Sequence, residues 1–235
     1  MKIPVIQLAC STCSLHSLCM PVGLTDEDMV RIDSLVSIRR HVKKGSTLFH
    51  NGEAFAALYA ICSGFFKTAL RTKEGVEQVT GFQMAGEMMG LDGIYSNQHT
   101  CDAIALEDSE VCVIPFEHLE DVARELASLQ HHVHQVLGKE IVREHNVMLL
   151  LGSLRAETKL ASFLLNLLQR LHARGFSDKE LVLRMTRQDI GSYLGLTLET
   201  VSRLFSKLDA TGIVQVHNRR LRILKSDALQ AMATH

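Results

Sequence analysis

The chain has 235 residues, with 25 Lys and Arg against 26 Asp and Glu, and hydrophobic residues make up 46% of it. This composition is typical of a chain that buries a core, and it excludes a globally disordered protein. No apolar run approaches the ~20 residues of a membrane-spanning helix, and six Cys are too few for a disulfide scaffold. The opening residues end in Leu8-Ala9-Cys10, as a lipoprotein signal does, but Pro4 and Gln7 interrupt the apolar stretch. We therefore expect a cytoplasmic protein with no membrane contact.

Charge is distributed unevenly along the chain. Residues 1–149 contain 12 basic and 19 acidic residues, whereas residues 150–235 contain 13 basic and 7 acidic residues. An acidic first part joined to a basic second part indicates two functions, and the basic part is the candidate for binding a polyanion.

The first half of the chain has the texture of a β-rich domain. A short helix is expected first, because Thr25 precedes three acidic residues, and Val30, Ile32 and Leu35 would face inward. From about residue 36 to 115, alternating or β-branched runs are separated by glycines every seven to twelve residues. This spacing is typical of an all-β sandwich or barrel. We predict a β-roll (jelly-roll) sensor domain over residues 23–126, preceded by a Cys-rich segment at residues 1–22.

A long helix is predicted after Pro115, with a dimerisation segment over residues 127–153. Apolar residues recur there with heptad-like spacing, and one acidic residue occupies the remaining position of the repeat. A seam of this kind packs against an equally long helix, and a second copy of the chain is the simplest partner. The seam positions are Leu137, Ile141, Glu144, Met148 and Leu151.

Glu144 is the acidic position of this seam. Across a two-fold interface it would lie near its own copy, and two carboxylates in a partly desolvated seam destabilise the dimer. The alternative is that Glu144 points outward and pairs with Arg143 or Lys139.

Residues 154–235 have the pattern of a winged helix-turn-helix domain. After a helix expected from Arg155 to Ala173, Ser177 and Glu180 have the spacing of a capping box and indicate another helix start. Thr186 and Thr197 then cap two short helices separated by a left-handed turn at Gly195. The inward positions of these helices are Ile190, Leu194, Val201, Leu204 and Leu208. Two alternating runs, at residues 213–216 and 221–224, surround a basic tip and predict the wing.

The second short helix presents polar side chains suited to base readout. Arg bonds guanine, Glu accepts from cytosine and Ser contacts several bases, so Glu199, Ser202 and Arg203 are candidate readers. The alternative is that Glu199 and Arg203 form only a surface ion pair. Other basic residues are placed for phosphates, which set affinity without reading sequence. These are Arg187, Lys207, Arg219, Arg220 and Arg222.

Three Cys near the N-terminus, Cys10, Cys13 and Cys19, have C-x2-C-x5-C spacing. They can converge on one metal site but do not complete it, so a fourth ligand must come from Cys62, Cys101 or Cys112. Thiolates suit zinc or an iron–sulfur cluster, and spacing alone separates these poorly. A second cluster of possible ligands, His131, His132 and His134, is expected to be a solvated helix start rather than a metal or haem site.

These patterns resemble the FNR group (fumarate and nitrate reduction regulators) of the CRP/FNR superfamily, across essentially the whole chain. The matching segments are Cys10 to Pro21, Val79 to Phe82, Val111 to Glu117 and Asp189 to Arg203. The resemblance implies an α+β chain with a cyclic-nucleotide-binding-like roll, a dimerisation helix and a winged helix-turn-helix domain. It also implies a [4Fe–4S] cluster whose ligands are Cys10, Cys13, Cys19 and Cys112. Cys62 and Cys101 lie outside the ligand positions of the group and are expected to be neutral core thiols.

The same resemblance implies a transcription regulator that acts under low oxygen. Such a protein would form a homodimer when the cluster is bound and bind inverted repeats of TTGAT half-sites. Glu199, Ser202 and Arg203 match the base readers of the group, and RNA polymerase is an implied partner. Oxygen would degrade the cluster and release the dimer.

Three alternatives remain open at this stage. A regulator of this fold could sense nitric oxide or redox state through the cluster, haem or zinc. An iron–sulfur electron-transfer protein is disfavoured by the helix-turn-helix and wing, and the lack of a GxGxxG or P-loop motif further argues against an enzyme. Cyclic-nucleotide binding is not expected, because residues 97–100 read Asn-Gln-His-Thr where an Arg-Ser pair would hold the cyclic phosphate.

Overall fold

The computed structural model describes residues 13, 19, 24–36, 38–71, 75–152 and 154–234. The chain divides into two compact units, and the boundary between Ile141 and Val142 lies inside one long helix. Among the described residues, no helix is both long enough and apolar enough to cross a bilayer.

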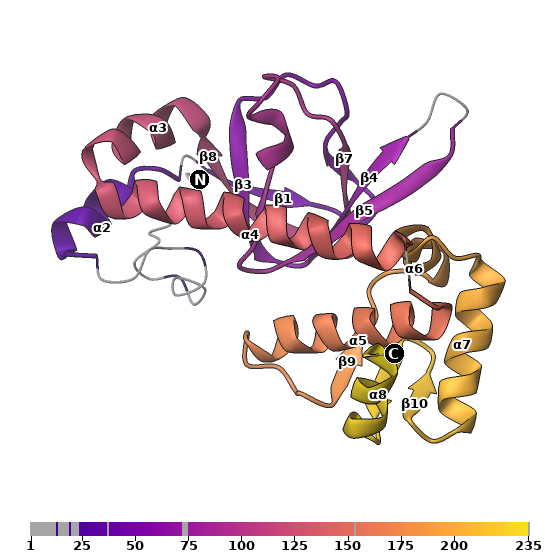
Figure 1. The fold of residues 1–235 in the computed structure, drawn as a ribbon. Helices are drawn as coiled ribbons and strands as arrows, with labels where there is room; N and C mark the ends of the chain where they lie inside the picture. The colour runs from indigo at the N-terminus through magenta and orange to yellow at the C-terminus, as the bar shows by residue number, and fades with distance from the viewer. Residues whose placement is uncertain are drawn as a thin grey trace, which may run out of the picture. The chain divides into compact units, whose positions relative to one another are not determined.

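Two four-stranded sheets form a β-roll in the first unit (Figure 1). The first sheet has the order β1-β8-β3-β6, and the second has the order β2-β7-β4-β5. The strands of the first sheet are β1 (Ile38–Val42), β8 (Ser109–Pro115), β3 (Ala57–Ser63) and β6 (Met88–Met89). Those of the second are β2 (Thr47–Phe49), β7 (Asp102–Ala105), β4 (Phe65–Arg71) and β5 (Glu77–Met84), and a short 3-10 helix η2 (Leu91–Gly93) follows β6. The predicted β-roll within an α+β chain is confirmed.

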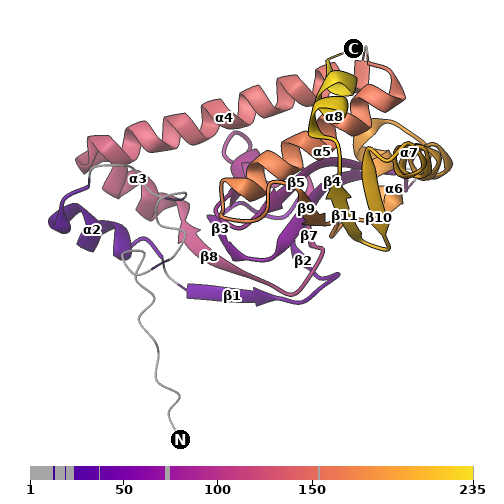
Figure 2. The same ribbon diagram turned by 90° about the horizontal axis from the view of Figure 1, so that it is seen from below.

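Among the described residues, this unit also contains the helices α2 (Asp26–Asp33), α3 (Phe116–Glu125) and the first part of α4 (Ala127–Gly152). Figure 2 shows α2, α3 and the start of α4 grouped at one end of the roll. The Arg31 guanidinium of α2 lies 3.2 Å from the Glu125 carboxylate of α3. Leu126, with extended backbone, separates α3 from α4.

The predicted inward face of α2 is partly wrong. Thr25 caps the helix through a capping box as expected, and Ile32 and Leu35 are buried, but Val30 is 71% exposed. Successive helical residues turn by ~100°, so positions 30 and 32 lie on opposite faces, whereas 32 and 35 share one face. The helix therefore buries one narrow face rather than all three residues.

The second unit is a winged helix-turn-helix, as expected. Its helices are α5 (Ala156–His172), α6 (Arg187–Leu194), α7 (Leu198–Ala210) and α8 (Ser226–Ala233), and its sheet has the order β10-β11-β9. The strands are β9 (Glu180–Val182), β10 (Val214–His217) and β11 (Arg220–Ile223). Asn218, with φ of 55°, makes the left-handed turn at the wing tip.

The helix start expected at Ser177 is wrong. The Ser177 hydroxyl accepts hydrogen bonds from the backbone N–H groups of Lys179 and Glu180, but the chain then enters strand β9. Leu181 is buried between two exposed neighbours, an alternation that fits a strand and pairs it with β11. The capping-box spacing here closes a turn before a strand.

The turn between α6 and α7 depends on two glycines. Gly195 adopts φ of 64°, the left-handed conformation predicted for it. Gly191 has no special backbone angle, but a Cβ there would lie 2.6 Å from the carbonyl oxygen of Leu196. Because Leu196 N–H donates to the Gly191 carbonyl at 2.8 Å, the two backbones are held in direct contact.

Gly191→Ala should therefore destabilise the second unit. The added methyl group must displace backbone rather than a flexible side chain, and such overpacking costs about 1–3 kcal/mol. Urea unfolding of the variant should show a lower midpoint than wild type. Gly138→Ala is the matched control, since a Cβ there meets nothing within 4 Å in the described part of the chain. An unchanged midpoint for Gly191→Ala would show that the turn relaxes without loss of stability.

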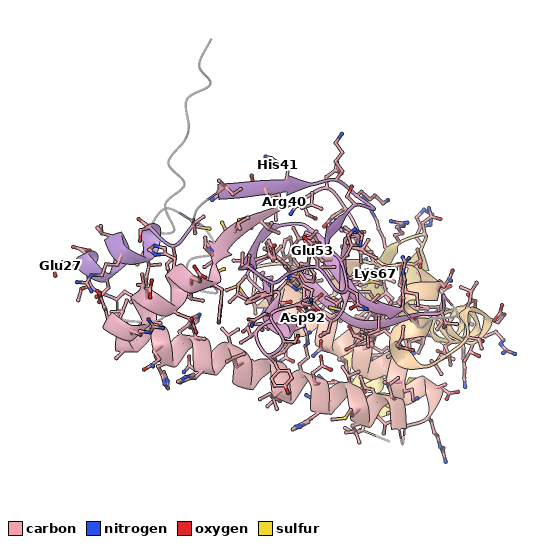
Figure 3. All side chains as sticks on the ribbon, turned by 90° about the horizontal axis from the view of Figure 1, so that it is seen from above. Glu27, Arg40, His41, Glu53, Lys67 and Asp92 are labelled. Atoms are coloured by element: carbon pink, nitrogen blue, oxygen red, sulfur yellow. The ribbon has the colours of Figure 1, made fainter. Side chains whose placement is uncertain are left out.

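A partly buried polar cluster in the roll includes Asp92, which is labelled in Figure 3. Its carboxylate accepts from the Thr100 N–H at 2.7 Å and lies 3.3 Å from Nδ1 of His99, a ring that is 2% exposed and stacks on Phe49. Burial alone would raise the pKa of Asp92, but the hydrogen bonds with His99 and Thr100 outweigh it and hold the pKa below its ordinary value.

Because of Asp92, the free energy of unfolding should decrease as the pH falls into the acid range. A carboxyl whose folded pKa is depressed stabilises the fold above its unfolded pKa of about 3.9, and that stabilisation is lost as pH falls through the folded pKa. Asp92→Asn should lower the free energy of unfolding at neutral pH by about 1–3 kcal/mol and weaken its dependence on pH below about 4. Urea titrations at several pH values measure both, and equal pH slopes for variant and wild type would contradict this role.

Candidate sensor thiols and nucleic-acid interface

Cys112 lies in the middle of β8, between two neighbouring strands. It faces Arg39 of β1 on one side and Ala60 of β3 on the other. β1 is the edge strand that also carries Arg40 and His41 (Figure 3). Cys112 is 9% exposed, so its thiol belongs to the core side of this sheet.

A second thiol lies against it. The sulfur atoms of Cys62 and Cys112 are 3.0 Å apart, and the Arg39 side chain also hydrogen-bonds Cys112. The hydrogen bond with Cys62 and, after it, the Arg39 guanidinium lower the pKa of Cys112 to about 7 against the opposing effect of burial. The same hydrogen bond, together with burial, raises the pKa of Cys62. The Cys62 contact and the Arg39 guanidinium therefore both favour the charged form of the Cys112 thiol.

Cys112 and Cys19 lie on one apolar cluster, which we call the thiol-side core. Its buried members come from α2, β3, β8, α3 and the start of α4, and Cys19 and Cys62 pack against them. The buried members are Ile32, Leu35, Leu58, Ala60, Cys112, Ile114, Leu119, Leu126 and Leu129.

His132 of α4 contacts the backbone of Cys19. Its Nε2 donates to the backbone carbonyl of Cys19 at 3.0 Å, and burial lowers the pKa of the ring. His131 and His134 are exposed, as expected for a solvated helix start, but His132 is not. The role of His132 depends on a contact between residues 113 positions apart, which no local pattern indicates.

The remaining candidate ligands are only partly placed. Cys13 is half-buried, and Cys10 lies outside the described residues. Within the described ranges, no three His, Cys, Asp or Glu side chains gather closely enough to hold a metal ion. Cys101 belongs to the other apolar cluster of the roll, where burial raises its pKa and its thiol donates to Asp92 at 3.5 Å.

The seam residues of α4 lie on a solvent-facing surface of the single chain. Ile141 and Met148 are 56% and 61% exposed, and Leu137 is half-buried. Glu144 is exposed, with its carboxylate 3.9 Å from the Arg143 guanidinium. The exposed surface is wider than the predicted seam. It comprises Ile141, Val142, Met148, Leu149 and Leu151.

The three candidate base readers lie in the first turns of α7. Thr197 caps this helix, and Val201, Leu204 and Leu208 anchor its buried face, as predicted. Glu199, Ser202 and Arg203 are all exposed. In the part of the chain that the structure describes, neither Glu199 nor Arg203 has an ion-pair partner within 4.0 Å, so the surface pair considered for them is not formed.

The candidate phosphate contacts differ in their surroundings. Arg219 and Arg220 are exposed at the wing tip. Lys207 lies 3.5 Å from Glu157, and Arg222 lies 3.1 Å from Glu180. Arg187 lies elsewhere: its guanidinium stacks 3.2 Å from the centre of the Phe205 ring, and burial lowers its pKa to about 10. This side chain packs α6 against α7 instead of extending into solvent.

Lys159 is a structural residue that sequence reasoning missed. It is 7% exposed, and its ammonium donates to the carbonyl oxygens of Leu151 at 3.0 Å and Leu194 at 3.4 Å. It therefore joins the last turn of α4 to the end of α6 within the second unit. A Lys after a predicted helix start gives no signal that it turns inward.

Two domain families match the chain. The cyclic nucleotide-binding domain matches residues 39–125, and the Crp-like helix-turn-helix domain matches residues 158–232. The FixK2 structure from Bradyrhizobium japonicum superposes with a TM-score of 0.78 at 28% identity, covering 84% of this chain and 98% of that one.

Curated relatives match over nearly the full length. The transcriptional regulatory protein btr of Bordetella pertussis is 43% identical over 95% of this chain and 92% of its own. The fumarate and nitrate reduction regulatory protein of Salmonella typhimurium is 42% identical over 96% of this chain and 90% of its own. With the β-roll and the winged helix-turn-helix already described, these matches show that the chain belongs to the FNR group of the CRP/FNR superfamily and is a DNA-binding transcription regulator of that type.

Proposed function

We propose that this regulator responds to oxygen through a [4Fe–4S] cluster held by Cys10, Cys13, Cys19 and Cys112. The observation that carries the proposal is the thiol-side core, on which Cys19 and Cys112 lie together with Leu129 of α4. The names of the relatives, which refer to fumarate and nitrate reduction, support the same assignment.

The donor chemistry fits such a group. Iron–sulfur clusters take thiolate ligands, and the neighbouring Cys62 thiol and Arg39 guanidinium lower the pKa of Cys112. Cys19 reaches the same apolar cluster, which limits water around both sulfurs. When bound, the cluster would supply the reactivity toward oxygen that makes the protein a sensor.

The residues around these thiols lead directly into α4. β8 carries Cys112 and continues into α3, and Leu126 and Leu129 place the start of α4 in the same core. The hydrogen bond from His132 to the Cys19 carbonyl connects Cys19 to α4 as well. A change in how Cys19 is held therefore acts on the start of the dimerisation helix.

In this proposal α4 pairs with α4 of a second copy through Leu137, Ile141, Glu144, Met148 and Leu151. The homodimer, located in the cytoplasm, then presents two copies of α7 to an inverted repeat of TTGAT half-sites in double-stranded DNA. Glu199, Ser202 and Arg203 read base edges, while Lys207, Arg219 and Arg220 contact phosphates. RNA polymerase is a further partner by family resemblance, with no residues assigned to it.

The roll is proposed to bind no cyclic nucleotide despite its fold. Asp92 is half-buried and contacts His99 and Thr100, within the segment 97–100 where a cyclic phosphate would require an Arg-Ser pair. A carboxylate beside an anionic phosphate would repel it.

Anaerobic protein should bind a TTGAT palindrome tightly, and air exposure should weaken that binding by at least tenfold. Cys112→Ser should bind weakly in both conditions, because one ligand is missing. Cys101→Ser is the matched control, since Cys101 is buried but outside the thiol-side core, and it should behave as wild type. Gel-shift titrations together with anaerobic visible spectra measure binding and cofactor.

Binding that neither air nor Cys112→Ser alters would remove the sensing mechanism and leave the DNA-binding assignment intact. A Soret band in the spectra would show that the cofactor is haem rather than the cluster. A colourless protein that nevertheless contains metal would indicate zinc. Weakened binding after nitric oxide but not after air would change the proposed signal.

Glu144→Ala should strengthen the dimer in air. Removing two like carboxylates from a seam flanked by apolar residues should tighten self-association about tenfold, or ~1.4 kcal/mol. Sedimentation equilibrium in air measures this, with Glu120→Ala, on an exposed position of α3, as the control. If Glu144→Ala and wild type dimerise equally, the ion pair with Arg143 already compensates the charge and the repulsion does not operate.

A further inference from the structure

Cys62 stands beside Cys112 because of an irregularity in the sheet. Along β3 and β8, Ala60 pairs with Cys112 and Ile61 pairs with Val111, but the register then shifts so that Ser63 pairs with Glu110. Cys62 is therefore the extra residue of a β-bulge, a feature that redirects a side chain. Its sulfur lies 3.0 Å from that of Cys112, about 1 Å beyond the length of a disulfide bond.

We propose that Cys62 and Cys112 are a redox-active thiol pair that forms a disulfide when no cluster is bound. To form a covalent bond from the 3.0 Å contact, each sulfur needs to move by only about 0.5 Å. Both side chains are on adjacent, hydrogen-bonded strands, so the backbone already holds the two Cβ atoms near one another.

Disulfide formation from two thiols requires a two-electron oxidant, and we propose that hydrogen peroxide supplies this oxidation. One thiol attacks the peroxide, its O–O bond breaks, and a sulfenic acid and one water form. The second thiol then attacks the sulfenic sulfur, the S–S bond forms and a second water leaves. The two sulfurs lose two electrons in total, and one peroxide is reduced to two waters.

The environment of the pair suits this reaction. Cys62 is half-buried, whereas Cys112 is nearly covered, so a small oxidant approaches from the Cys62 side. By contrast, Cys101 lies in the other apolar cluster, hydrogen-bonded to Asp92. A disulfide between Cys62 and Cys112 also shields Cys112 from further, irreversible oxidation.

Disulfide formation would compete with cluster assembly, and this consequence rests on the proposed function. A sulfur that is bonded to Cys62 has no thiolate to offer to iron. The oxidised pair would therefore hold the protein in its cluster-free form until a thiol reductant opened the bond. The protein would then respond in two successive steps: oxygen first removes the cluster, and peroxide then oxidises the Cys62–Cys112 pair.

The test uses full-length, cluster-free protein that is reduced and desalted under anaerobic conditions. It is treated with stoichiometric hydrogen peroxide, alkylated and digested, and the Cys peptides are mapped by mass spectrometry. Cluster reconstitution with ferrous iron and sulfide is followed by visible absorption before and after treatment, and again after dithiothreitol. Cys62→Ser is compared with Cys101→Ser, and Cys62→Ala replaces the first variant if it does not fold.

In wild type and Cys101→Ser, the expected product is a Cys62–Cys112 linked peptide, with reconstitution reduced at least fivefold and recovered after dithiothreitol. In Cys62→Ser the linked peptide should be absent. Recovery of Cys112 alkylated, or linked to a Cys of the N-terminal segment, in peroxide-treated wild type would overturn the pair. If the linked peptide forms but the reduced protein never takes up a cluster, the thiol-pair proposal is supported and the proposed function is contradicted.

Discussion

The register between β1, β8 and β3 is the constraint on which the sensor unit depends. It sets Arg39, Cys112 and Ala60 in one row, so that the sulfur faces the thiol-side core with a guanidinium beside it. A slip of one residue would turn Cys112 to the opposite face of the sheet and carry the apolar residues of β8 with it. Because Ile114 is buried on the same strand and β8 continues into α3, the burial that fixes the core also fixes the position of Cys112, the proposed ligand.

A comparable constraint operates at the other end of α4. The Lys159 ammonium bonds carbonyl oxygens at the ends of α4 and α6, and removing its charge would leave these groups buried without a donor. Gly191 then allows α6 to approach the turn, which fixes where α7 begins. The exposed candidate readers of α7 thus owe their position to one buried cation, Lys159, and to the missing side chain of Gly191.

Local chemistry made much of this structure predictable. The sequence identifies Thr25, Thr186 and Thr197 as helix caps and Gly195 as the left-handed residue between two amphipathic helices. Each of these features is determined by residues that are close in sequence. Features set by tertiary contacts were not predictable. The Cys62–Cys112 contact needs both a strand register and a bulge, and periodicity reveals neither. At Ser177, a spacing shared by helix caps and turns was resolved only by pairing of β9 with β11.

The surface of α4 suggests why a small change in the sensor unit would be enough to alter assembly. Ile141, Met148 and their neighbours expose apolar area whose burial favours association. Glu144 opposes it. Its ion pair with Arg143 is long, at 3.9 Å, and the Glu144 carboxylate is exposed, so the pair compensates little of that opposition. In the proposed dimer these opposing free energies leave a small net balance. A shift at the start of the helix, where Leu129 shares the thiol-side core with Cys19 and His132 bonds its carbonyl, then needs to supply only a few kcal/mol to change the dimer population.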